Sequence, residues 1–140
     1  MQKSNEATSH SNDQKKLLRY KVLVIDDDID ITTTFREALE GSRSFSVRIY
    51  NDPQQALSEF EAGSYDILLL DVRMPYLNGF ELYREIKKID HEVKVCFITA
   101  YETYYEQLKR DFPKLDVSCF IKKPVRPDDL IRLLIEELES

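Results

Sequence analysis

Five short apolar or alternating stretches recur along the chain and predict five β-strands. They cover residues 22–25, 45–49, 67–70, 93–98 and 117–121. The first and third are apolar at every position, a pattern typical of central strands in a parallel sheet whose two faces are both covered. The second alternates apolar and polar residues, which favours an edge strand with one face in water.

Between these strands, apolar residues return at helical spacing and predict five helices. Gly41, Gly63 and Pro113 are expected to mark helix ends, and Pro53 and Pro127 helix starts. Strand and helix alternate strictly, which predicts an α/β fold, a five-stranded parallel sheet with helices on both faces. The strand order 2-1-3-4-5 places the alternating strand at an edge and both fully apolar strands inside. This is the arrangement of a flavodoxin-like three-layer αβα sandwich.

Composition narrows the class of protein. Residues 1–19 are almost all polar or charged and are predicted to form a disordered N-terminal tail, which leaves residues 20–140 as one domain. With 42% hydrophobic and 33% charged residues, the chain has the composition of a soluble globular protein. No stretch approaches the ~20 apolar residues of a membrane span, and no signal-peptide core is expected. The net charge of −6 argues against direct binding to nucleic acid.

The two cysteines and three glycines of the chain argue against a zinc-binding protein and a dinucleotide-binding protein. Cys96 and Cys119 lie in apolar stretches and are expected to be buried free thiols in a reducing cytoplasm. Neither is spaced from another Cys or a His as zinc ligands are, so no zinc site is expected. Three glycines are too few for the glycine-rich loop of a dinucleotide-binding fold.

Polar side chains follow the predicted strands where each strand ends. The first strand runs into Asp26 and Asp27, the third into Asp71, the fourth into Thr99 and the fifth into Lys123. Because ligands of open α/β sheets bind at the carboxyl ends of the strands, these side chains are expected to share one crevice. Three carboxylates repel one another unless a cation lies between them, and oxygen ligands of this kind suit Mg²⁺. An aspartate there could attack phosphorus to give an acyl phosphate, with the hydroxyl and the ammonium holding the phosphoryl oxygens.

Each of these side chains also has a simpler explanation. The three consecutive aspartates could cap the following helix, and capping is the preferred role for Asp28. Thr99 could be an ordinary β-branched strand residue, and Lys123 an ordinary solvated charge. A row of aromatic side chains on the fourth helix leaves core packing and a partner surface as open alternatives. The row comprises Tyr101, Tyr104 and Tyr105.

Four motifs at the strand ends resemble the receiver domain of two-component response regulators, a single domain with a chemotaxis-regulator-like fold. They are Val24-Ile25-Asp26-Asp27, Leu70-Asp71-Val72-Arg73-Met74-Pro75 with Asn78-Gly79, Ile98-Thr99-Ala100, and Phe120-Ile121-Lys122-Lys123-Pro124. Each motif is weak alone, but four in this order, each at a strand end, are specific. The resemblance covers about residues 20–140. The chain departs from it over residues 112–116, where receivers usually have a Gly-Ala-type turn.

The resemblance implies a metal ion and a phosphorylated residue. Asp71 would be the phosphoacceptor. Asp27 and Asp71 would bind Mg²⁺ together with the backbone carbonyl of Arg73, and Asp26 would act through a bound water. This set of ligands comes from the resemblance, whereas the clustering of the carboxylates follows from the predicted strand ends.

The resemblance also implies which side chains contact the phosphoryl group and respond to it. Thr99 and Lys123 would contact the group. Lys123 is preferred to Lys122 because the family's lysine immediately precedes a proline, often through a cis bond. Thr99 and Phe120 would be the switch residues, which change position on phosphorylation.

The function implied is that of a cytoplasmic response regulator in a phosphorelay. It would receive a phosphoryl group from a sensor histidine kinase or a phosphotransfer protein. It would signal to a downstream protein through the face formed by the fourth helix, the fifth strand and the fifth helix, with no nucleic acid bound and no membrane insertion. A homodimer is left open. Such a domain is not an enzyme on other substrates, since it catalyses only its own phosphorylation and dephosphorylation.

Two rival functions fit parts of the same pattern. The aspartates at 26 and 28 also match the Asp-x-Asp start of haloacid-dehalogenase-type phosphatases, although that family needs a further acidic motif and usually a longer chain. A scaffold with a receiver fold that is never phosphorylated is the second rival. No output domain is expected after Ser140, so the chain would be a stand-alone receiver or a piece of a longer protein.

Overall fold

The computed structural model describes residues 19–101, 103–111, 113 and 119–140. The tail predicted over residues 1–19 lies outside these residues except for Arg19, and it stays a prediction. The divergent segment at 112–116 also lies outside them, apart from Pro113, as do the side chains of Tyr104 and Tyr105.

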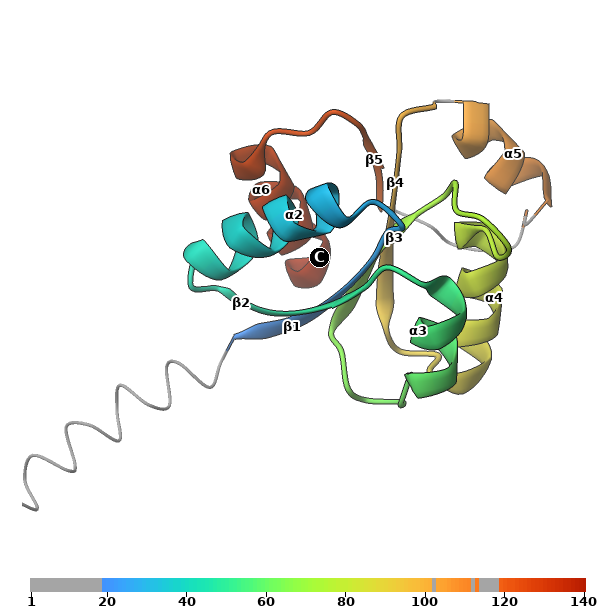
Figure 1. Cartoon of the computed structure of the whole chain (residues 1–140), viewed down its shortest axis with the longest axis horizontal. Helices are drawn as coiled ribbons and strands as arrows, with labels where there is room; N and C mark the ends of the chain where they lie inside the picture. Colours follow the sequence, from blue (N-terminus) through green and yellow to red (C-terminus); the bar gives the residue numbers. More distant parts are fainter. Residues whose placement is uncertain (1–18, 102, 112, 114–118) are drawn as a thin grey trace, which may run out of the picture.

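The described residues form one parallel five-stranded sheet in the order β2-β1-β3-β4-β5, which confirms the predicted fold class and strand order (Figure 1). The strands are β1 (Tyr20–Ile25), β2 (Phe45–Tyr50), β3 (Ile67–Asp71), β4 (Lys94–Thr99) and β5 (Cys119–Lys122). All residues of β3 are buried, whereas burial alternates along β2, as a central strand and an edge strand require.

Helices cover both faces of the sheet. They are α2 (Ile29–Gly41), α3 (Pro53–Glu59), α4 (Gly79–Ile89), α5 (Thr103–Asp111) and α6 (Pro127–Glu139). One apolar layer includes Phe35 and Leu39 of α2 with Leu130 and Leu134 of α6. The other packs α3 and α4 against the opposite face, and α5 lies on the same side as α4 (Figure 1). Among the described residues, no helix is both long enough and apolar enough to cross a membrane.

Helix α3 ends earlier than predicted. It stops at Glu59, because Phe60 adopts an extended backbone and stacks its ring on Tyr65 with 5.9 Å between the ring centroids. Gly63 then takes a positive φ of 81° in the following turn, a conformation that glycine adopts without strain. The helix end predicted at Gly63 is therefore wrong by one helical turn, because burial of the Phe60 ring overrides the glycine signal.

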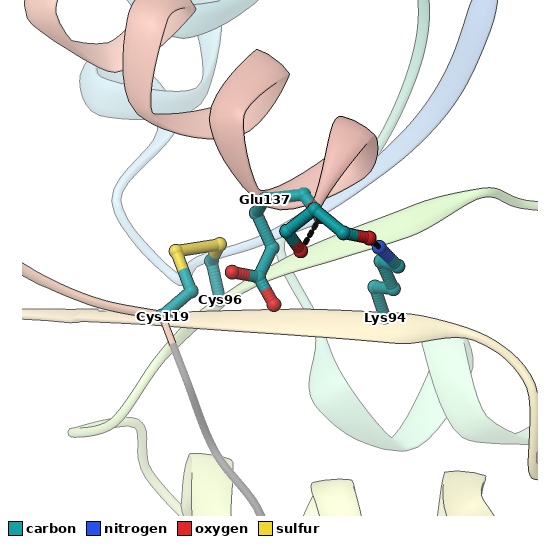
Figure 2. The surroundings of a disulfide bond; sticks show 5 residues. Lys94, Cys96, Cys119 and Glu137 are labelled. Atoms are coloured by element: carbon teal, nitrogen blue, oxygen red, sulfur yellow. Dashed lines mark hydrogen bonds between the residues drawn. A yellow bond between two sulfur atoms is a disulfide. The ribbon is translucent and has the colours of Figure 1, made fainter.

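The prediction of free thiols is also wrong, because a disulfide joins Cys96 to Cys119 (Figure 2). The two residues are direct register partners on the parallel strands β4 and β5, with Cα atoms 4.5 Å apart. Apolar surroundings indicated burial of each cysteine, but they carried no information on which strand positions face each other. The register of β4 against β5 brings the sulfurs together.

Candidate functional site

Three carboxylates meet at the carboxyl edge of the sheet. Asp26 and Asp27 follow β1, and Asp71 is the last residue of β3. One carboxylate oxygen from each of the three lies within 4.8 Å of the others. Asp26 and Asp71 are buried and Asp27 is exposed, so the cluster opens to solvent on one side. Hard oxygen donors with one open side suit Mg²⁺, which keeps several of its waters, so these residues fit the metal implied by the sequence.

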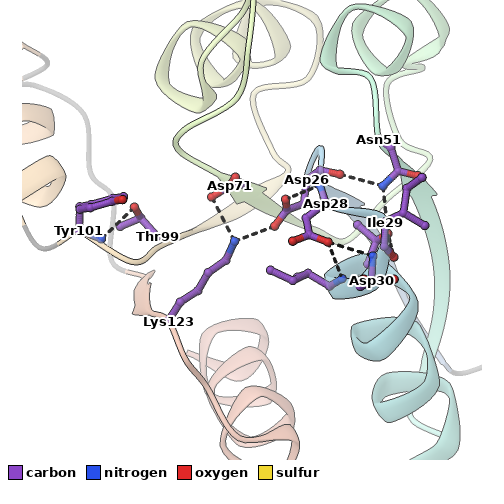
Figure 3. A network of polar contacts seen from close by, with 11 residues as sticks. Asp26, Asp28, Ile29, Asp30, Asn51, Asp71, Thr99, Tyr101 and Lys123 are labelled. Atoms are coloured by element: carbon purple, nitrogen blue, oxygen red, sulfur yellow. Dashed lines mark hydrogen bonds and ion pairs between the residues drawn. The ribbon is translucent and has the colours of Figure 1, made fainter.

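Lys123 lies between the two buried carboxylates (Figure 3). Its Nζ is 2.9 Å from an oxygen of Asp26 and 3.4 Å from an oxygen of Asp71. Its backbone N–H donates to the carbonyl of Thr99, and its peptide bond to Pro124 is cis. The ammonium therefore balances part of the negative charge that the carboxylates bring together.

Burial and charge shift the acidities of this cluster. Burial, and then the nearby charge of Asp26, raise the pKa of Asp71 to about 7, although Lys123 opposes the shift. Burial would lower the pKa of Lys123, but its hydrogen bonds and charge interactions with Asp26 and Asp71 outweigh this and raise it. Although Asp27 is exposed, partial desolvation and then the charge of Asp26 raise its pKa. All three shifts favour the protonated form of the group concerned.

A polar network fixes the turn that carries Asp26. Its side chain accepts a hydrogen bond of 3.0 Å from the backbone N–H of Asp28, and its carbonyl accepts one of 2.8 Å from Nδ2 of Asn51. Asn51 Nδ2 also donates to Thr32 Oγ1, so one amide ties the end of β2 to both the turn and α2 (Figure 3). Asn51 was not among the residues predicted from the sequence. Its position directly after β2, at the same edge of the sheet, was the available signal.

Asp28 has the capping role that the sequence favoured. Its carboxylate accepts from the backbone N–H groups of Asp30 and Ile31, 3.0 and 3.3 Å away, at the start of α2. It is therefore not a member of the acidic cluster, which comprises Asp26, Asp27 and Asp71.

A glycine brings α4 close to Asp71. The N–H of Gly79 donates to the carbonyl of Val72 at 2.8 Å, and a Cβ at position 79 would collide with the Asp71 carbonyl. Asn78 caps α4 and forms a capping box with Glu81. Only glycine allows this close approach, so the Asn78-Gly79 pair fixes the loop that follows Asp71.

Thr99 and Phe120 lie on neighbouring strands beside the cluster. Thr99 ends β4, is 1% exposed, and accepts a hydrogen bond of 3.2 Å from the backbone N–H of Tyr101. Phe120 is half-buried against Phe97, the residue opposite it in the strand register, with ring centroids 6.0 Å apart. The structure thus brings Thr99 and Lys123 to the carboxylates' edge of the sheet and places Phe120 three residues before Lys123.

Two further side chains meet above this edge. The Arg73 guanidinium lies over the ring of Tyr101, 5.4 Å from its centroid. Arg73 follows Asp71 by two residues and Tyr101 follows Thr99 by two, so the pair joins the loops after β3 and β4. Tyr101 is 49% exposed, which argues against core packing for this member of the tyrosine row.

The parallel sheet, with its strand order β2-β1-β3-β4-β5, has a chemotaxis-regulator-like α/β fold. Residues 22–135 match the response regulator receiver domain family, and the chain belongs to that family. It is therefore a receiver domain of the response regulators of two-component systems, and the haloacid-dehalogenase alternative is set aside.

Relatives and solved structures agree with this assignment. The chain is 30% identical over 128 residues to the cyclic di-GMP phosphodiesterase response regulator RpfG of Xanthomonas campestris, covering 91% of this chain and 34% of the relative. It is 29% identical to the transcriptional regulatory protein RprY of Bacteroides fragilis, covering 80% of this chain and 46% of the relative. The non-phosphorylated HemR receiver domain of Leptospira biflexa superposes with a TM-score of 0.76 at 27% identity, covering 87% of this chain and 96% of that one. The chain thus spans less than half the length of these two relatives.

Proposed function

We propose that residues 20–140 accept a phosphoryl group on Asp71 from the phosphohistidine of a sensor histidine kinase or a phosphotransfer protein, in the cytoplasm. The observation that carries this proposal is the position of the Asp71 carboxylate at the end of a buried central strand, beside Asp26, Asp27 and an ammonium. Asp27, Asp71 and the Arg73 backbone carbonyl would hold Mg²⁺, with Asp26 acting through a water. Arg73 follows β3 by two residues, so its backbone is near this edge of the sheet.

The residues of the chain supply most of what the transfer needs. The ionised Asp71 oxygen attacks phosphorus and forms the new P–O bond. The P–N bond to the donor imidazole breaks, and its electron pair leaves with the imidazole nitrogen, which takes up a proton. Lys123 Nζ, already 3.4 Å from Asp71, and the Thr99 hydroxyl stabilise the charge on the phosphoryl oxygens. A bound Mg²⁺ would add positive charge at the same oxygens.

The phosphoryl group would act on the face formed by α5, β5 and α6. It adds roughly −1.5 to −2 charge and new acceptor oxygens. Thr99 would move to bond one of them, and Phe120 would turn into the space that this opens. Downstream protein partners would bind the changed face. In this scheme the chain catalyses only its own phosphorylation and dephosphorylation.

With acetyl phosphate and Mg²⁺, we expect the chain to gain one phosphoryl group, measured by intact mass. The Asp71→Asn chain should gain none, and EDTA should prevent uptake by the parent. Asp66→Asn is the matched control, because Asp66 is an exposed carboxylate at the opposite end of β3 whose hydrogen bond from the Lys21 N–H an amide oxygen can still accept. Equal labelling of Asp71→Asn and the parent would reject the assignment, and a parent that takes up nothing would favour the scaffold alternative.

Beryllofluoride mimics the phosphoryl group. Its binding should change the rate of amide hydrogen exchange in α5, β5 and the start of α6. We expect this because Thr99 and Phe120 lie on the strands that flank α5 in sequence. Hydrogen exchange with and without beryllofluoride measures it, and β2, at the far edge of the sheet, is the internal control. A change confined to the loops around Asp71 would contradict the proposed route.

The Arg73–Tyr101 pair should lengthen the life of the acyl phosphate. Because Arg73 and Tyr101 stack on each other in the loops that follow Asp71 and Thr99, they would hinder an attacking water. We expect the Arg73→Ala, Tyr101→Ala double variant to lose phosphate several-fold faster, which follows from the decay of the phosphorylated mass after removal of acetyl phosphate. Arg84→Ala is the control, since Arg84 lies on α4 beyond this loop. An unchanged decay rate would mean that shielding does not set the lifetime.

A further inference from the structure

The disulfide ties an edge strand to the interior of the sheet. Cys119 is the first residue of β5, which is the edge strand beside β4, and Cys96 lies on β4. Both sulfurs belong to the apolar layer that packs against Leu130 and Leu134 of α6 (Figure 2). Both residues are buried, Cys96 at 0% and Cys119 at 7% exposure.

The bond also encloses Thr99 and α5 in a covalent ring. The chain from 97 to 118 runs between the two cysteines, and it contains Thr99 and all of α5. Phe120 directly follows Cys119, and Lys123 follows three residues later. The pair Cys96–Cys119 is the first of the four register pairs between β4 and β5. Forming or breaking this bond therefore changes how firmly the strand carrying Phe120 is held.

The domain has an extensive apolar core in addition to this bond. Disulfides are typical of small secreted domains that cannot build a sufficient core. Here two apolar layers cover both faces of the sheet and include residues from β1, β3 and β4 that are 0% exposed. We propose that Cys96 and Cys119 form a reversible thiol–disulfide exchange site, whose reaction partner is a dithiol reductant or the corresponding disulfide oxidant, and whose state sets the mobility of β5 and α5.

The exchange is a two-electron reaction in which the disulfide of the chain is reduced and the dithiol is oxidised. A thiolate of the reductant attacks the Cys119 sulfur, the bond between the cysteines breaks, and its electron pair leaves on the Cys96 sulfur, which takes up a proton. The second thiolate of the reductant then attacks the reductant's own sulfur in the mixed disulfide and releases Cys119, which is protonated in turn. The reductant ends as a disulfide and the chain as a dithiol, and a disulfide oxidant drives the reverse.

The first test counts thiols in the folded, unphosphorylated chain without Mg²⁺. The chain is equilibrated with graded ratios of reduced to oxidised dithiothreitol, trapped with an alkylating reagent and weighed intact. We expect one transition, from no label to two labels, that is reached from either direction. The Cys96→Ala, Cys119→Ala double variant is the control and should stay unlabelled. A cystine that reduces only in denaturant, or two labelled thiols at every ratio, would overturn the proposal.

The second test measures coupling to the switch elements by hydrogen exchange. Reduction should speed exchange of the Phe120 and Ile121 amides and of α5 by about tenfold or more, because a closed loop loses its constraint. Strands β1 and β3 should be unaffected, and the double variant should exchange like the reduced parent whether or not reductant is present. No change at β5, or an equal change throughout the sheet, would overturn the coupling. Neither test depends on phosphorylation, so their failure and failure of the proposed function are distinguishable.

Discussion

The Asp71→Asn chain is expected to be more stable than the parent by about 2 kcal/mol near pH 8 in EDTA. Asp71 is 6% exposed, and burial together with the charge of Asp26 raises its pKa to about 7. Each unit of that shift corresponds to about 1.4 kcal/mol, so the full shift would give about 4. We expect about half of this stability gain, because solvent screens the cluster on the side where Asp27 is exposed. Asparagine keeps the size of the side chain and removes the charge.

The stability difference between the Asp71→Asn chain and the parent is expected to increase with pH. The pKa of Asp71 is higher in the folded chain than its usual value of 3.8, so the folded state binds more protons between pH 3.8 and about 7. The stability that this group contributes is present below pH 3.8 and is lost as the pH rises through about 7. The difference between Asp71→Asn and the parent should therefore be small near pH 4 and largest near pH 8.

Urea melts of both chains at the two pH values measure this difference, and other titrating groups largely cancel in the comparison. Asp27→Asn is the matched control within the cluster, since Asp27 is exposed and should give a smaller gain. Mg²⁺ should stabilise the parent more than Asp71→Asn by mass action. A variant that is less stable than the parent near pH 8 would show that Lys123 fully compensates the Asp71 charge.

Reduction of the disulfide is expected to lower the free energy of unfolding by about 3 kcal/mol. The two cysteines are 23 residues apart, and opening a loop of that length restores conformational entropy to the unfolded chain. Urea melts with and without dithiothreitol measure the loss. The Cys96→Ala, Cys119→Ala double variant should be insensitive to dithiothreitol. An unchanged urea midpoint in the reduced parent would mean that the bond is absent or that the reduced state recovers the same stability.

The sequence was sufficient for the fold because each signal was local and repeated. The alternating pattern at 45–49 placed β2 at an edge, and the fully apolar stretches before Asp26 and Asp71 placed β1 and β3 inside. The proximity of Asp26, Asp27 and Asp71 could be predicted in the same way, since the carboxyl ends of parallel strands lie at one edge of the sheet. The structure confirms that proximity, whereas the chemical roles of these residues stay predictions.

What the sequence could not supply depends on which side chains meet in the folded chain. The Cys96–Cys119 bond depends on the register of two strands, and the Asn51 hydrogen bonds depend on the fit of one loop against another. The end of α3 depends on where the Phe60 ring finds its partner. The stacking of Arg73 on Tyr101 likewise joins two loops that follow different strands.

Because Cys96 and Cys119 close a covalent ring, a single cleavage of the backbone within the ring does not separate the chain into two molecules. A protease that hydrolyses one peptide bond between residues 97 and 118 would leave two fragments that are still covalently joined. The nicked chain would keep Asp71 on one fragment and Lys123 on the other, yet migrate as one species until a reductant separates them. The redox state would thus decide whether proteolytic damage near α5 divides Asp71 from Lys123.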